Sequence, residues 1–113
     1  MMAMLMGLRT ISPQALDALR RDGRVDVYDV NPRGRWLEAR VPGARTLDHE
    51  RMQASDLPAD RTRPLVFYCS NPLCRKAPIA AKRALALGYA DVRVMAAGIS
   101  GWRAAGLPVE SGE

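Results

Sequence analysis

The sequence predicts a compact α/β domain with a mostly parallel sheet and helices on both of its faces. Three observations favour this class. Strand and helix patterns alternate along the chain, as they do in βαβ units. The run from Leu65 to Cys69 is apolar throughout, which is typical of a strand buried on both faces. The length of 113 residues, with 48% hydrophobic and 26% charged side chains, suits one packed core.

The first half of the chain contains one predicted helix and one predicted strand. Ser12 is suited to cap a helix whose first residue is Pro13. Leu16 and Leu19 recur near helical spacing, so we expect a helix of about ten residues that Gly23 ends. Residues Val25–Val30 follow as a short strand rich in valine.

The second half contains the strongest patterns. The apolar strand Leu65–Cys69 leads through a loop into Arg75–Leu87, which is rich in good helix formers and ends at Gly88. Val92–Met95 is predicted as another strand. Ile99–Ala105 is predicted as a last short helix, because glycine and proline follow it.

We expect residues 1–113 to form a single cytoplasmic domain without a membrane partner. The longest stretch without a charged residue, Pro64–Cys74, is eleven residues, whereas a membrane-spanning helix needs roughly twenty. The apolar start, Met1–Leu8, lacks the basic region and cleavage site of a secretory signal. The sequence leaves open whether residues 1–7 form a flexible extension, an edge strand or a dimer contact, and it does not fix the oligomeric state.

The net charge of +5 is unevenly distributed. Residues 1–60 contain nine basic and nine acidic side chains, whereas residues 61–103 contain eight basic residues and one acidic residue, Asp91. The excess positive charge therefore surrounds the two cysteines, where it favours a small anion or a thiolate as readily as a phosphate backbone. With only six aromatic residues available for base stacking, we expect no nucleic-acid partner.

Cys69 is the candidate catalytic nucleophile. It ends the most apolar strand, and in parallel sheets ligands bind beyond the carboxyl ends of the strands. The loop that follows leads directly into the strongest predicted helix, so backbone N–H groups and the helix start should converge on the sulfur. Such surroundings bind an anion and lower the pKa of a thiol.

These residues resemble those of single-domain rhodanese proteins. The motifs Val27-Tyr-Asp-Val30, Val41-Pro-Gly-Ala44, Val66-Phe-Tyr-Cys69 and Ala97-Gly-Ile-Ser-Gly-Trp-Arg-Ala-Ala-Gly-Leu-Pro-Val109 occur in the family's order and spacing. The resemblance implies a compact three-layer rhodanese-like domain with about five strands. It also implies a sulfurtransferase in which Cys69 takes a sulfane sulfur from thiosulfate or another persulfide donor and passes it to a thiophilic acceptor.

The resemblance also suggests which residues bind the substrate. They lie in the loop and the first helical turn: Ser70, Asn71, Leu73, Cys74, Arg75 and Lys76. Three residues depart from the family's loop: Pro72 has no amide hydrogen, Cys74 is a second cysteine, and Ala77 stands where serine is common. The second cysteine resembles a subset of the family. Cys74 is either a resolving thiol that forms a disulfide with Cys69, or a small buried side chain.

Persulfide chemistry needs a ring of N–H donors and no cofactor, metal ion or histidine. His49 is the only histidine, and we expect no metal site. We expect a small anionic sulfur donor and a thiol or cyanide-like acceptor as partners. Lys76, Lys82 and Arg83 form either a docking face for an acidic sulfur-carrier protein or a solvated helix face.

Two other functions remain open at this point. Cys69 and Arg75 have the C-x5-R spacing of cysteine phosphatases and certain arsenate reductases, in which the arginine binds oxyanion oxygens. However, Tyr68 precedes the cysteine where histidine is usual, and Lys76 follows the arginine where serine or threonine is expected. The second alternative is a non-catalytic rhodanese-like binding module in which Cys69 stays inert.

Overall fold

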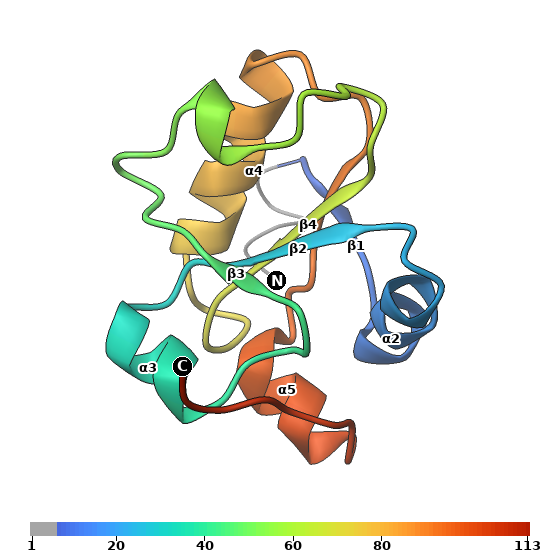
Figure 1. The fold of residues 1–113 in the computed structure, drawn as a ribbon, viewed down its shortest axis with the longest axis vertical. Helices are drawn as coiled ribbons and strands as arrows, with labels where there is room; N and C mark the ends of the chain where they lie inside the picture. Colours follow the sequence, from blue (N-terminus) through green and yellow to red (C-terminus); the bar gives the residue numbers. More distant parts are fainter. Residues whose placement is uncertain (1–6) are drawn as a thin grey trace.

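A computed structural model describes residues 7–113 of the chain (Figure 1). Its elements, in chain order, are β1 (Arg9–Thr10), α2 (Pro13–Arg21), β2 (Asp26–Asp29), α3 (Arg33–Glu38), β3 (Arg45–Thr46), η1 (Ala54–Asp56), β4 (Leu65–Tyr68), α4 (Lys76–Ala86), β5 (Val92–Val94) and α5 (Gly98–Ala104). Apart from Gly7, the residues of the predicted N-terminal extension 1–7 lie outside the described residues.

One five-stranded sheet forms the centre of the domain, with the order β1-β5-β4-β2-β3. Every neighbouring pair is parallel. All four residues of β4 are buried, as expected for a central strand. In the register, Tyr68 of β4 pairs with Asp29 of β2, and Phe67 pairs with Val94 of β5. The carboxyl ends of β2, β4 and β5 therefore meet at one edge of the sheet.

Helices cover both faces of this sheet (Figure 1). Ala80 and Ala84 of α4 belong to a buried cluster that also contains Phe67. Leu16 of α2 and Trp102 of α5 belong to a second cluster, on the opposite face. Because alternate strand residues point to opposite faces, the central strands β2 and β4 contribute to both clusters. The α/β fold class and the three layers predicted from the sequence are thus confirmed.

All six elements predicted from the sequence are present, with ends within one residue of the predicted ranges. The Ser12 hydroxyl accepts a hydrogen bond from the Ala15 amide at 3.1 Å, so the predicted cap of α2 is confirmed. The sequence interpretation missed β1, β3, α3 and η1. Two-residue edge strands carry no detectable periodicity.

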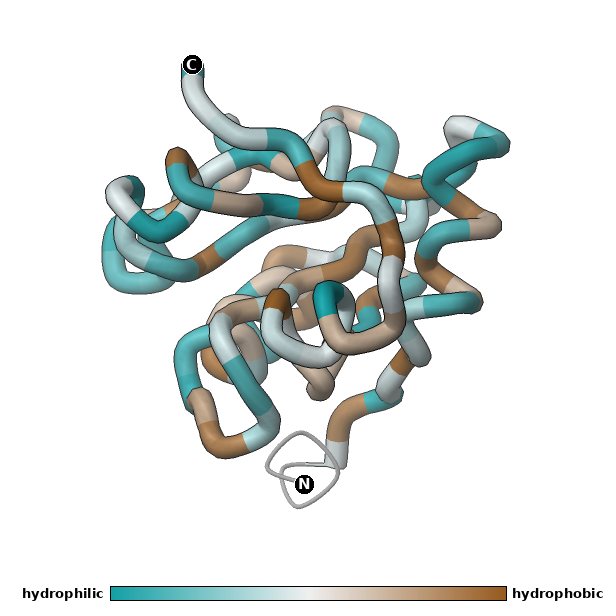
Figure 2. Tube along the Cα trace, turned by 90° about the horizontal axis from the view of Figure 1, so that it is seen from below, coloured by the Kyte–Doolittle hydropathy of each residue, from teal (hydrophilic) through white to brown (hydrophobic). Residues whose placement is uncertain are grey.

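In Figure 2 the most hydrophilic stretches lie mainly in outer loops and helix turns. Within residues 7–113, no helix has the length and apolar character needed to cross a bilayer.

Candidate functional site

Cys69 lies directly after β4, at the edge where the carboxyl ends of the central strands meet. Its side chain is almost completely buried, with 3% of the residue exposed. The backbone here is held by α5: the Ile99 amide donates to the Cys69 carbonyl at 2.9 Å, and the Ser100 amide donates to the Ser70 carbonyl at 3.1 Å. The segment that carries the cysteine is therefore fixed by two hydrogen bonds.

Gly98 allows this close approach between α5 and the loop. Its φ angle is +67°, in the left-handed region that favours glycine. A Cβ atom at this position would lie 2.5 Å from the carbonyl carbon of Ser70 and 2.6 Å from the amide nitrogen of Asn71. These neighbours are backbone atoms, which have no alternative rotamer. Gly98 is thus a residue of the site that the sequence interpretation did not single out, although it lies within a motif that was recognised.

Cys69 and Cys74 form a disulfide bond, with their Cα atoms 6.3 Å apart. Cys74 is half-buried and packs against the cluster beneath α4. The cavity beside the two cysteines has a volume of about 10 Å³, which is room for about one water molecule. The sulfur of Cys74 thus reaches that of Cys69 while its side chain also packs against the core, so the role of Cys74 stays a prediction. In this disulfide form, the cavity is too small for a substrate anion.

The loop amides differ from the expected arrangement. The Leu73 amide donates to the Asn71 side-chain oxygen at 2.9 Å, and the Cys74 amide donates to the Asn71 carbonyl at 3.1 Å. Two of the N–H groups expected to converge on Cys69 are therefore occupied by Asn71 in the disulfide-bonded loop. The physical reason is that an Asn side chain readily forms a local turn with the amide two residues later.

Asn31 connects the end of β2 to the candidate loop. The Ser70 hydroxyl donates to the Asn31 side-chain oxygen at 2.6 Å, and Asn31 is buried. The sequence analysis did not include Asn31 among the site residues. The position of Asn31 just after β2 could have identified it as a site residue, because β2 runs parallel to β4 and the carboxyl ends of the two strands meet at the same edge of the sheet.

A buried hydrogen-bond network supports these strand ends. The Tyr68 hydroxyl donates to Asp29 at 2.7 Å and accepts from the Val41 amide at 3.0 Å. Asp29 also accepts from the Asn31 amide at 2.8 Å. Burial raises the pKa of the Asp29 carboxyl, and the hydrogen bonds from Tyr68 and Asn31 oppose that rise. Burial likewise raises the pKa of Tyr68, so its hydroxyl remains a neutral donor.

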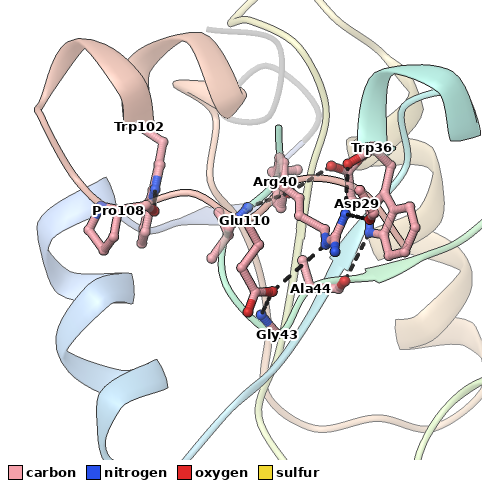
Figure 3. A network of polar contacts seen from close by, with 11 residues as sticks. Asp29, Trp36, Arg40, Gly43, Ala44, Trp102, Pro108 and Glu110 are labelled. Carbon is pink, nitrogen blue, oxygen red and sulfur yellow. Dashed lines mark hydrogen bonds and ion pairs between the residues drawn. The ribbon is translucent and has the colours of Figure 1, made fainter. Parts of the chain in front are cut away.

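The C-terminal segment braces the turn that contains Val41 (Figure 3). Arg40 is buried, stacks 3.9 Å from the centroid of the Trp36 ring and donates to the Gly112 carbonyl at 2.8 Å. Glu110 accepts from the Gly43 amide at 2.9 Å. The Trp36 indole donates to a backbone carbonyl of the same turn. The turn that Tyr68 holds through the Val41 amide is thus also held through Arg40, the residue before Val41.

Arg75 and Lys76, the two cationic residues that follow Cys74 in the chain, lie in different surroundings. Arg75 is exposed and precedes the first residue of α4, and Leu73 is 81% exposed. Lys76 lines a separate groove of about 380 Å³, together with Arg33 and His49 among others. The structure brings Ser70 and Cys74 beside Cys69, while Arg75 and Leu73 face solvent.

Three consecutive residues in this groove could offer ligand atoms to a metal ion. The atoms of Asp48, His49 and Glu50 lie within 4.8 Å of one another. Both carboxylates are exposed, and the Asp48 side chain already accepts a hydrogen bond from the Glu50 amide. Nothing else in the described residues adds a buried ligand to this group, so it carries no metal-site assignment.

The model of the rhodanese-like domain family matches residues 12–105, which is most of the chain. The chain belongs to the rhodanese-like family. The match spans all the elements that build the site, from the cap of α2 to the end of α5. The five-stranded parallel sheet described above is the rhodanese fold.

One relative of this rhodanese-like chain is named as a transcriptional regulator. The HTH-type transcriptional regulator Rv0324 of Mycobacterium tuberculosis is 33% identical over 95 residues, which are 82% of this chain and 41% of the regulator. The chain thus spans about two fifths of that relative's length.

Solved structures give the same fold. A thiosulfate sulfurtransferase from Pseudomonas aeruginosa has a TM-score of 0.82 at 29% identity, over 94% of this chain and 20% of that one. The BH2092 protein from Bacillus halodurans has a TM-score of 0.83 at 22% identity, over 96% of this chain and 80% of that one.

Proposed function

We propose that this rhodanese-like domain is a sulfurtransferase that carries a sulfane sulfur as a persulfide on Cys69. The observation that carries the proposal is the position of Cys69 at the carboxyl end of the central strand, directly before the loop that leads into α4. This is where ligands bind in parallel sheets. The similarity to a thiosulfate sulfurtransferase, at 29% identity over nearly the whole chain, supports the same chemistry.

The reaction begins with the reduced loop, in which Cys69 is a thiol. Its thiolate attacks the outer sulfur of thiosulfate, the sulfur–sulfur bond of thiosulfate breaks, and sulfite leaves with the electron pair. The product is a persulfide anion on Cys69. The start of α4 and the cations Arg75 and Lys76 favour both the thiolate and this anion.

The remaining loop residues bind the donor in this proposal. Ser70, Asn71, Leu73 and Cys74 surround the outer sulfur once reduction opens the loop, and their backbone N–H groups stabilise its charge. A thiol or cyanide-like acceptor then takes the sulfur. An acidic sulfur-carrier protein is a further acceptor class, with the exposed Lys82 on α4 as part of its docking face. The domain acts without a cofactor.

Intact mass spectrometry tests the proposal. The reduced protein is incubated with thiosulfate, and the same measurement is made on Cys69→Ser and, as a matched control, on Cys74→Ser. We expect a gain of one sulfur in Cys74→Ser that a reductant removes, and no gain in Cys69→Ser. A sulfur gain that persists in Cys69→Ser would contradict the assignment of the nucleophile.

The same samples distinguish the two other functions. If no variant gains sulfur but the wild type hydrolyses an aryl phosphate or reduces arsenate, Cys69 and Arg75 act as a C-x5-R pair. If neither reaction occurs and Cys69 has an ordinary thiol pKa near 8.5, the domain is a binding module. The similarity to a transcriptional regulator makes this last outcome worth measuring.

A further inference from the structure

The Cys69–Cys74 disulfide lies at the proposed reaction centre. Its two cysteines are five residues apart on one loop, so the bond connects no distant parts of the fold. Two buried clusters of apolar side chains already hold the sheet and helices together without it. Its most direct effect is chemical, because it occupies the sulfur of the candidate nucleophile.

Burial of Cys69 favours attack by a thiol that already lies inside the loop. Cys69 is 3% exposed, and the cavity beside the two cysteines is about 10 Å³. In this disulfide-bonded form the cavity admits about one water-sized group, so the loop must open before any external molecule, thiosulfate included, can reach the Cys69 sulfur. The Cys74 sulfur, in contrast, reaches the Cys69 sulfur to within bonding distance. Of the thiols that could attack Cys69, that of Cys74 needs the least opening of the loop.

We propose that Cys74 resolves the Cys69 persulfide within the chain and releases hydrosulfide. This inference rests on the proposed function, since it begins from the persulfide. The Cys74 thiolate attacks the Cys69 sulfur, and the bond between that sulfur and the sulfane sulfur breaks. The sulfane sulfur leaves with the electron pair and takes up the proton that Cys74 lost. The sulfane sulfur is thereby reduced to hydrosulfide, while the two cysteines are oxidised to the disulfide.

A dithiol reductant completes the cycle. Cys74 is more exposed than Cys69, and its neighbour Leu73 is 81% exposed, so a reductant thiol meets Cys74 first. Attack there forms a mixed disulfide on Cys74 and releases the Cys69 thiolate at the start of α4. The second thiol of the reductant then displaces Cys74 and becomes oxidised. The net reaction converts thiosulfate and a dithiol into sulfite, hydrosulfide and a disulfide.

A single-turnover experiment tests the resolution step. Reduced wild type, Cys74→Ser and Cys69→Ser are freed of reductant and mixed anaerobically with thiosulfate. Hydrosulfide is quantified, and the free thiols are alkylated before mass spectrometry. We expect the wild type to release one hydrosulfide per chain and to resist alkylation as the disulfide. Cys74→Ser should keep a stable persulfide and release none, and Cys69→Ser should do neither. Wild type kept anaerobically without thiosulfate is the control for adventitious oxidation.

Failure of this inference is distinguishable from failure of the proposed function. If wild type and Cys74→Ser both keep a stable persulfide without releasing hydrosulfide, the resolution step is refuted and the sulfurtransferase function stands. If Cys74→Ser gains no sulfur from thiosulfate, the donor part of the proposed function fails. Inorganic polysulfide then loads Cys69 chemically and expels hydrosulfide or a shorter polysulfide from either protein, so mass spectrometry of the alkylated chain decides the step: the Cys69–Cys74 disulfide in wild type and a retained persulfide in Cys74→Ser support it. A persulfide retained by both proteins refutes it.

Discussion

Replacing Gly98 by alanine tests how α5 fixes the candidate loop. An alanine at a φ of +67° costs about 1–2 kcal/mol, because its Cβ crowds the adjacent carbonyl oxygen. The same Cβ would also lie 2.5 Å from the Ser70 carbonyl carbon and 2.6 Å from the Asn71 nitrogen. Forcing an extra carbon into a packed site costs about 1–3 kcal/mol more. We therefore expect Gly98→Ala to lower the free energy of unfolding by about 2–5 kcal/mol.

Gly106→Ala is the matched control for this prediction. Its φ angle of +74° is similar, but a Cβ there would meet nothing within 4 Å. This variant should therefore lose only the backbone cost of about 1–2 kcal/mol. The difference between the two variants isolates the contact between Gly98 and the loop.

Urea unfolding followed by circular dichroism, with a common slope, gives both free energies. Persulfide loading of the reduced variants gives a second readout. To avoid the overlap, the chain must move the Ser70–Asn71 peptide and weaken the hydrogen bonds that α5 donates to the Cys69 and Ser70 carbonyls. We expect Gly98→Ala to load sulfur more slowly than Gly106→Ala. The reasoning is refuted if the variants agree within about 0.5 kcal/mol and load at the same rate.

Three further predictions concern the buried polar groups and the disulfide. Tyr68→Phe leaves a buried amide and a buried carboxylate oxygen without a partner and should cost about 2–5 kcal/mol in urea unfolding. Tyr28→Phe should cost nothing, because the buried Tyr28 hydroxyl has no partner among residues 7–113, and an equal loss in both would contradict this. The pKa of Asp29 is raised in the native state from the ordinary carboxyl value of 3.8. Between that value and the native pKa, the native state binds more protons than the unfolded state, so the contribution of Asp29 makes the free energy of unfolding fall as the pH rises. The stability of Asp29→Asn relative to wild type should therefore increase over this pH range, and a difference that does not change with pH would refute the shift. Reduction of the Cys69–Cys74 bond should lower the free energy of unfolding by about 2 kcal/mol, as expected for closure of so short a loop, with Cys74→Ser insensitive to reductant.

The larger part of the fold follows from local sequence patterns. β4 is apolar at every position, and α4 is rich in alanine, so composition alone predicts both elements. The Ser12 cap and Pro13 likewise predict where α2 begins. These patterns also place Cys69 at the carboxyl end of a buried strand, and that position is what makes it a candidate nucleophile.

The edge strands β1 and β3 could not be predicted from local sequence patterns. β1 and β3 have two residues each, and all four of these residues are exposed. Neither hydrophobic alternation nor a buried face distinguishes them from a loop. They exist because β5 and β2 offer unpaired backbone groups beside them, which is a property of the assembled sheet.

By itself, the sequence determined that this is an α/β domain, and it predicted a candidate nucleophile directly after the central strand. Only the tertiary structure decided what surrounds that thiol. Asn31 is 39 positions from the Ser70 hydroxyl that it holds, and Gly98 approaches a loop that starts 29 residues earlier. The bond between Cys69 and Cys74 depends on the path of the loop between β4 and α4. The physical reason is that secondary structure follows from neighbouring residues, whereas a site forms from strand ends that meet only when the sheet assembles.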